Sequence, residues 1–208
     1  MKSLTLVFAI LVAGICQAQV KLSLTVNGQP VGTATFKQGL KASGSLEQTV
    51  TMALKGPTGT ANFAYLSTSD KAGRTIKETN TQTMGATSKT VVVEFGSKTV
   101  KVTTIQNGKS TSKSVPIPAG NRADASTFWF VNVKPKAGAT STYMHFDVDT
   151  GSWKKETTKY VGDDVVPGTK LKGHHIHHDD GDMWLDDKGT PLRIETSQNG
   201  IQMVFVRQ

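Results

Sequence analysis

The stretch TVVVEFGSKTVKVTTIQNGKSTSKSV, residues 90–115, decides the fold class of this protein. Its valine, isoleucine and threonine residues alternate with polar residues, as expected for strands with one buried face. The pairs Gly96-Ser97 and Asn107-Gly108 divide the stretch into three segments, and Asn-Gly between alternating segments is a strong signal for a β-hairpin. Connections this short allow only antiparallel pairing. Residues 90–115 therefore predict three consecutive antiparallel strands.

The same pattern continues on both sides of this stretch. Asn27-Gly28 separates two alternating segments upstream, and Thr150-Gly151, Pro167-Gly168 and Asn199-Gly200 occupy turn positions downstream. The other segments that we expect to form strands are residues 20–26, 29–36, 45–54, 61–69, 141–149, 153–162, 169–178, 183–187, 188–195 and 201–208. The turn before residue 183 is expected to be DDGD, residues 179–182. The chain is thus predicted to be all-β.

One segment, residues 121–133 (NRADASTFWFVNV), departs from the hairpin pattern. A short helix capped near Asn121 or Asp124 would bury Phe128, Trp129 and Phe130 against the concave side of the sheet. The alternative is a buried strand, because STFWFVNV is also rich in β-forming residues. We expect the helix, and prolines on either side make either element short.

The first 18 residues have the features of a secretory signal peptide. Lys2 precedes an apolar run from Leu4 to Ile15, and small residues lead to an expected cleavage after Ala18. Cys16 offers a lipoprotein alternative, but the bulky Ile15 stands where lipoprotein signals carry a small residue. Residues 19–208 are then a single β-rich domain without cysteine, which we expect to be monomeric. The predicted location is periplasmic or extracellular, and no later segment is long and apolar enough to span a bilayer.

The charge distribution bears on the class of partner. The whole chain carries a formal net charge of +8, and removal of Lys2 with the leader leaves +7. The basic residues are mostly lysines dispersed along the chain, with few arginines and no interleaved aromatic residues. Nucleic-acid sites cluster basic and aromatic side chains, so we expect no nucleic-acid partner.

The C-terminal half resembles a known group of proteins. The residues that carry the resemblance are Asp124-x-Ser126 before an aromatic cluster, Pro135-x-x-Gly138, Tyr160-x-Gly162, the stretch WLDDKGTPLRI (184–194) and Gly200-Ile201. This order is similar to a broad family of exported bacterial proteins of unknown function with a Trp-Leu-x-Asp…Pro-Leu/Val-Arg-Ile motif. The resemblance implies a large curved antiparallel sheet, a half-barrel like that of periplasmic lipoprotein carriers, around an apolar cavity. It implies no catalytic residues.

The implied cavity suggests a ligand. In residues 141–153, Met144, Phe146 and Val148 share one strand face, and Tyr143, His145 and Asp147 share the other with Asp149. We expect Met144 and Phe146, with Phe128 and Phe130, to bind a lipid or another apolar or amphipathic ligand. The predicted function is that of an exported, noncatalytic envelope protein.

The stretch HHIHHDDGDMWLDDKG, residues 174–189, offers an alternative function. On a strand, His175 and His177 share one face and lie about 7 Å apart, so both imidazoles can reach one zinc ion. A third ligand would come from His145 or a nearby aspartate such as Asp147, Asp149, Asp180 or Asp182. The simpler interpretation is a solvent-facing strand that happens to carry histidines, with no cofactor. A further possibility is a pH response, because clustered imidazolium groups repel one another.

Signatures of catalysis are absent from the sequence. It contains neither a G-x-S-x-G elbow nor an H-E-x-x-H motif, and the chain after the leader has no cysteine nucleophile. Asp147-x-Asp149 and the Asp179–Asp182 segment are too short for a calcium loop and suit tight turns instead. The protein is therefore not expected to be an enzyme.

Overall fold

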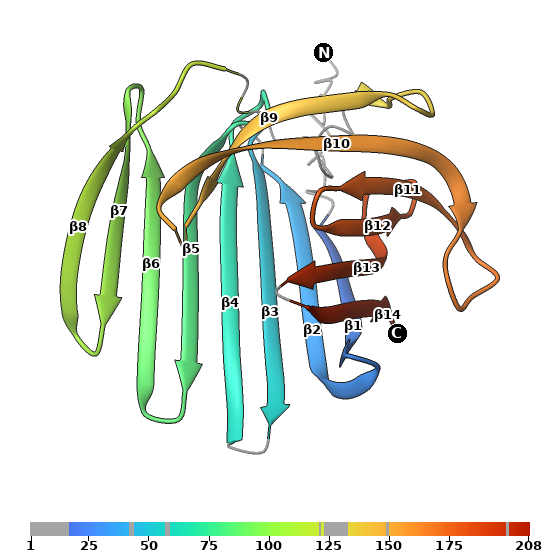
Figure 1. Ribbon diagram of the computed structural model, residues 1–208, viewed down its shortest axis with the longest axis horizontal. Coiled ribbons are helices and arrows are strands. Elements are labelled where there is room, and N and C mark those ends of the chain that lie inside the picture. Colours follow the sequence, from blue (N-terminus) through green and yellow to red (C-terminus); the bar gives the residue numbers. More distant parts are fainter. Residues whose placement is uncertain are drawn as a thin grey trace, which may run out of the picture.

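The structure is a computed structural model that describes residues 17–41, 44–56, 59–120, 122, 133–148, 150–198 and 200–208. These residues form one large antiparallel sheet (Figure 1). No helix in the described ranges is long and apolar enough to cross a membrane. The prediction of an all-β, curved antiparallel sheet is confirmed.

Fourteen strands make up the sheet. They are β1 (Gln17–Val26), β2 (Gln29–Leu40), β3 (Leu46–Gly56), β4 (Gly59–Ser69), β5 (Thr75–Met84), β6 (Thr87–Phe95), β7 (Thr99–Gln106), β8 (Lys109–Pro116), β9 (Thr140–Asp147), β10 (Ser152–Val165), β11 (Lys172–His178), β12 (Gly181–Leu185), β13 (Pro191–Gln198) and β14 (Ile201–Arg207).

Most connections between these strands lie where turn residues predicted them. At Asn27-Gly28 and Asn107-Gly108 all four residues have positive φ, between 48° and 80°, as a two-residue type I′ hairpin requires. Two details differ from the prediction. Strand β5 was not predicted, and the turn expected at residues 179–182 is shorter because β12 already begins at Gly181.

The order of strands across the sheet differs from their order along the chain. It runs β8-β7-β6-β5-β4-β3-β2-β1-β14-β13-β12-β11-β10-β9. Strand β1 therefore pairs with β2 on one side and with β14 on the other, where Leu24 lies opposite Phe205. The sheet is not closed into a barrel, because its two edge strands, β8 and β9, do not pair.

A core cluster joins the two ends of the sheet, and we call it the seam. Val93 and Val100 from β6 and β7 pack with Phe146 of β9, and Phe95, Val115 and Trp153 lie against them. The ring centroids of Phe146 and Trp153 lie 5.3 Å apart at a steep angle, as aromatic pairs prefer. Trp153 Nε1 also donates a hydrogen bond to the carbonyl of Pro116, at 2.9 Å. Side chains thus hold together two edges that no backbone ladder connects.

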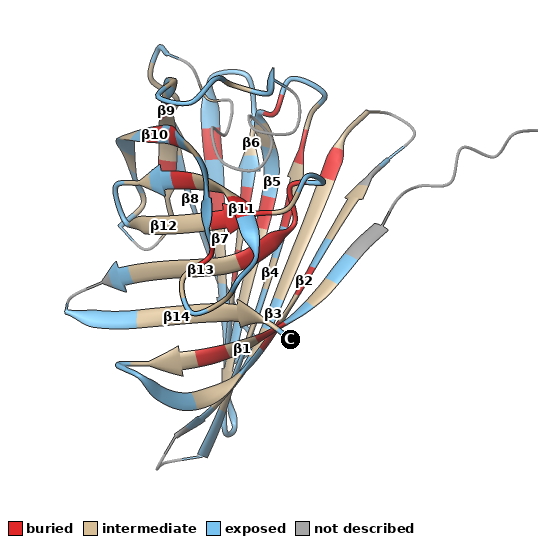
Figure 2. Ribbon diagram, turned by 90° about the vertical axis from the view of Figure 1, so that its right-hand side faces the viewer, coloured by how far each residue is buried: buried red, intermediate tan, exposed pale blue. Residues whose placement is uncertain are grey.

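Two further clusters fill the concave side. Leu22, Ala34 and Phe36 pack over β1 and β2, and Tyr160, Ile176 and Leu185 pack over β10 to β12. Buried positions recur along the strands and alternate with exposed ones (Figure 2), which is the period expected of a sheet with one solvated face.

Several predicted features lie outside the described residues. They are the leader through Cys16, most of the segment 121–133 in which the helix was expected (residue 121 and residues 123–132, with Phe128 and Phe130), and the turn residues Asp149 and Asn199. Strand β1 begins at Gln17, two residues before the first residue of the expected mature chain.

Candidate functional site

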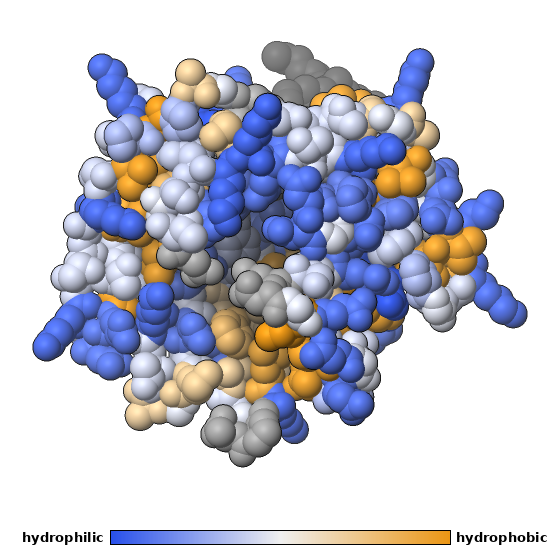
Figure 3. All heavy atoms as spheres, viewed as in Figure 1, coloured by the Kyte–Doolittle hydropathy of each residue, from blue (hydrophilic) through white to orange (hydrophobic). Residues whose placement is uncertain are grey.

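The concave side of the sheet contains a pocket of about 490 Å³. Strands β3 to β6 form one wall, and the end of β9 forms the other. Figure 3 shows a hollow in this face of the molecule, with hydrophilic side chains around it. The lining residues are Met52, Phe63, Ala64, Tyr65, Glu78, Asn80, Thr81, Gln82, Lys89, Val91, His145, Asp147 and Val148. The volume lies in the range of about 300–1,000 Å³ that is typical of small-molecule sites.

A second pocket of about 260 Å³ adjoins the first. The two share Tyr65, Glu78 and His145 and therefore lie side by side, and we call them together the concave site. The second pocket extends toward the seam and is lined there by Met144, Phe146 and Trp153.

The lining of this site is more polar than the sequence predicted. Glu78 is buried, and the Tyr65 hydroxyl donates to its Oε1 at 3.3 Å. Tyr143 donates in the same way to Glu156 Oε2, at 2.9 Å. Asp147 is paired with Lys154. Apolar and hydrogen-bonding groups therefore meet in one cavity, which suits an amphipathic molecule better than a purely apolar one.

Both faces of β9 contribute to the site, although only one was expected to do so. Met144 and Phe146 line the second pocket, and Tyr143 and His145 from the opposite face line it as well. Phe146 is only 2 % exposed and is foremost a core residue of the seam.

The histidine cluster lies on β11, between β10 and β12. As predicted, His175 and His177 share a face, and Asp182 of β12 joins them. The Oδ1 atom of Asp182 lies 2.7 Å from His175 Nε2 and 2.9 Å from His177 Nδ1. The His175 ring stacks on Trp184, with centroids 4.5 Å apart. Burial opposes ionisation of Asp182, but the bonds from His175 and His177 outweigh it and hold the pKa of this carboxyl below its usual value.

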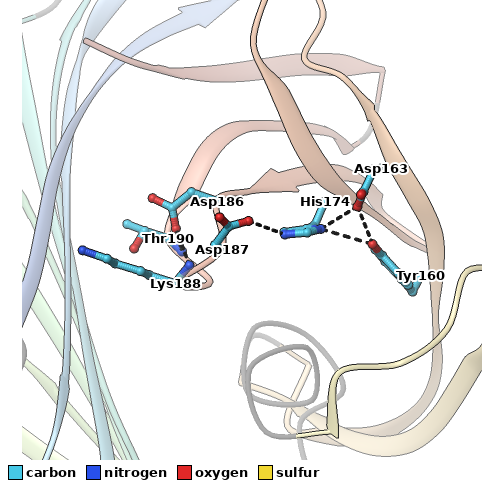
Figure 4. Close-up of polar contacts among 7 residues, drawn as sticks. All are labelled: Tyr160, Asp163, His174, Asp186, Asp187, Lys188 and Thr190. Atoms are coloured by element: carbon cyan, nitrogen blue, oxygen red, sulfur yellow. Dashed lines mark hydrogen bonds and ion pairs between the residues drawn. The ribbon is translucent and has the colours of Figure 1, made fainter.

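On the other face of β11, His174 lies between two carboxylates (Figure 4). Its Nδ1 atom is 2.7 Å from Asp163 Oδ1, and its Nε2 atom is 2.9 Å from Asp187 Oδ1. The Tyr160 hydroxyl donates to the same Asp163 oxygen, at 2.7 Å. Burial and this bond raise the pKa of Tyr160 to about 12, while the bonds from Tyr160 and His174 lower the pKa of Asp163. Carboxylates beside the imidazoles oppose the mutual repulsion predicted for charged histidines.

His145 does not join this cluster. It lies opposite Lys154 on β10, whereas His177 lies on the far side of β10 opposite Lys159, five residues along. That offset corresponds to about 17 Å along the strand. Within the part of the chain that the structure describes, no group of three or more His, Cys, Asp or Glu residues is arranged to hold a metal ion.

The turn between β12 and β13 explains part of the C-terminal motif. Asp186 Oδ1 accepts hydrogen bonds from the backbone N–H groups of Lys188, at 3.0 Å, and Thr190, at 2.9 Å. Its Oδ2 accepts from Arg207 of β14, also at 2.9 Å. Burial of Asp186 is outweighed by these bonds, which lower its pKa. The Trp-Leu-Asp-Asp-Lys-Gly-Thr-Pro stretch thus has a structural role, since it ties the turn between β12 and β13 to the final strand β14.

The lowered pKa values of Asp182 and Asp186 predict acid sensitivity. A carboxyl whose folded pKa lies below its unfolded value of about 3.9 stabilises the fold fully above that value and loses this contribution as pH falls through the folded pKa. We therefore expect the free energy of unfolding, measured in urea, to fall below about pH 4. The variant Asp186→Asn should show a smaller decrease over the same range. If the free energy of unfolding fell as much in Asp186→Asn as in the unmodified protein over this pH range, the contribution assigned to Asp186 would be contradicted.

Comparison with known proteins supports the description of the fold and gives no information about the site. No known protein family and no curated protein matches this sequence. Among solved structures, the chain is similar to a β-barrel-like protein of the domain of unknown function DUF1849 from Brucella abortus. The TM-score is 0.60 at 8 % sequence identity, over 93 % of this chain and 96 % of that chain. The similarity shows the architecture alone and agrees with the β-rich class of unknown function expected from the sequence.

Proposed function

We propose that the protein is an exported, noncatalytic envelope protein that binds an amphipathic small molecule in its concave site. The observation that carries this proposal is the composition of the larger pocket. Met52, Phe63 and Val91 offer apolar contact, while Glu78 and His145 offer hydrogen bonds at the junction with the second pocket. An apolar tail and a polar head would each find matching groups.

The sequence supports the location and the noncatalytic role. The leader at residues 1–18 indicates export, and the chain carries no recognised catalytic motif. The half-barrel architecture agrees with a binding role, because a curved sheet with unpaired edges can shelter a ligand on its concave side.

The proposal predicts that filling the pocket abolishes binding. Asn80 lines the larger pocket, and its neighbour Thr79 lies on the opposite face of β5, between Leu66 and Val92. We expect the purified, delipidated protein to bind a dansyl-labelled fatty acid with enhanced fluorescence. Asn80→Phe should weaken this binding at least tenfold, because the larger ring occupies the cavity. Thr79→Phe should leave it unchanged, as the matched control.

Two results would overturn the proposal. One is the absence of any fluorescence enhancement with dansyl-labelled fatty acids and with a dansyl-labelled alkylamine of similar length. The other is equal weakening by Asn80→Phe and Thr79→Phe, which would place the probe outside the concave site. Far-ultraviolet circular dichroism of both variants verifies that the sheet is intact.

A further inference from the structure

The end of the β10–β11 hairpin, residues 165–172, includes the last residue of β10, the turn and the first residue of β11, and it presents two large apolar side chains to solvent. Val165 is 50 % exposed and Leu171 is 58 % exposed. The connection projects from the sheet at the right of Figure 1, and Figure 3 shows hydrophobic side chains at the same edge with hydrophilic ones beside them. Single exposed apolar residues are ordinary, but here two of them flank one projecting turn. We call residues 165–172 the tip.

Hydrogen bonds hold the tip in a defined shape. The Val166 N–H donates to the Leu171 carbonyl at 2.9 Å, and the Thr169 N–H donates to the Val166 carbonyl at 3.1 Å. The Leu171 N–H donates to Thr169 Oγ1, also at 3.1 Å. With its backbone fixed in this way, the tip does not fold its apolar side chains back onto the sheet.

Packing at the base anchors the tip to the body of the protein. Val166 is fully buried in a cluster with Trp184 and Leu192. Gly173 continues this contact, because a Cβ at that position would lie 3.0 Å from Leu192 Cδ1. Val165 and Leu171 are thus held outward from a rigid base.

Basic side chains accompany the apolar ones. Lys170 and Lys172 flank Leu171 and are both exposed. Two acidic residues precede the tip: Asp163 contacts His174 and also interacts electrostatically with Lys172, and Asp164 lies 3.8 Å from His175. The tip therefore combines apolar and cationic groups on a chain that is basic as a whole.

We propose that the tip docks the protein on an anionic lipid surface. Val165 and Leu171 enter the boundary between head groups and acyl chains, while Lys170 and Lys172 contact lipid phosphates. Apolar groups rimmed by lysines are the chemistry by which peripheral proteins bind anionic membranes. A single turn of eight residues is small for a stable protein interface, which favours lipid over a protein partner. This docking is independent of the concave site.

Vesicle sedimentation tests the apolar part of the proposal. We expect the protein to bind vesicles of phosphatidylglycerol and phosphatidylcholine, and Val165→Ser/Leu171→Ser to bind at least tenfold more weakly. Met84 and Ile201, which are 53 % and 47 % exposed on other strands, provide the control. The variant Met84→Ser/Ile201→Ser should bind like the unmodified protein. Equal effects of the two double variants would overturn the proposal, as would a lack of binding to these vesicles.

A second pair of variants tests the charge. Lys170→Glu/Lys172→Glu should abolish binding to the anionic vesicles, whereas Lys109→Glu/Lys113→Glu on β8 changes the net charge equally and should have a much smaller effect. If both double variants lost vesicle binding equally, the attraction to the vesicles would come from the overall charge of the protein and not from the tip. The variant Leu171→Trp adds a fluorescent side chain to the tip, so that insertion can be observed directly and not only through a loss of binding. Brominated lipids should quench its added fluorescence, and an absence of quenching would contradict insertion of the tip.

Discussion

Replacing Phe146 with alanine should destabilise the protein by about 4 kcal/mol, because truncating a buried aromatic residue loses its burial and leaves a cavity. Phe146 is the buried residue of β9 in the seam, where its ring contacts those of Phe95 and Trp153. No backbone ladder joins β8 to β9, so a cavity at this position weakens the contact that brings the two sheet edges together. The expected loss exceeds that of most single substitutions.

Urea unfolding measures this effect, and hydrogen exchange locates it. Phe146→Leu keeps most of the apolar volume and should cost less than half as much. Trp153→Phe removes the hydrogen bond to the Pro116 carbonyl and should cost about 1 kcal/mol. Amide exchange should accelerate in β8 and β9 of Phe146→Ala before it does in β1 or β14. A loss below about 1.5 kcal/mol, well under the usual cost of such a truncation, would show that Phe146 does not pack in the seam.

Replacing Asp186 with alanine should cost about 3 kcal/mol, because hydrogen bonds to a charged carboxylate are stronger than neutral ones. Its side chain is 28 % exposed and accepts from two backbone groups and from Arg207. The loss acts on the turn between β12 and β13 and on the attachment of β14, which pairs in turn with β1. A cost of this size lowers the melting temperature by about 6–12 °C in a protein of this length.

The neighbouring Asp187 is a close control. It has the same chemistry one position along the turn, but its side chain is 98 % exposed and contacts His174 (Figure 4). Asp187→Ala should leave the melting temperature nearly unchanged, because exposed ion pairs contribute little. Similar decreases in melting temperature in Asp186→Ala and Asp187→Ala would mean that Asp186 acts only through surface charge and does not tie the turn between β12 and β13 to β14.

The two predictions concern the edges and the interior of the same sheet. Phe146 secures the seam where the sheet ends approach each other, and Asp186 secures the region where the last strands join the first. Loosening the seam should also alter the second pocket, since Phe146 and Trp153 line it. The fatty-acid probe is therefore expected to bind Phe146→Leu more tightly than Phe146→Ala.

Local sequence determined the strands and most of their turns. Asn27-Gly28 and Asn107-Gly108 adopt the positive φ that Asn-Gly favours, and the alternation in β6 and β7 placed one face of each of these two strands inside. The same period of two correctly placed His175 and His177 on one face. Strand β5 was missed because its run of threonine, asparagine and charged residues lacks an apolar stripe. Glu78 and Asn80, which line the larger pocket, were missed with it.

Only the tertiary structure decided how these strands are joined. The pairing of β1 with β14 connects residues about as far apart as the chain allows, and no local pattern encodes that register. The separation of His145 from His177, the meeting of β8 and β9 at the seam, and the polar lining of the concave site all follow from the strand order. Side-chain periodicity is local and can be read from the chain, whereas contacts between distant strands depend on the packing of the whole sheet.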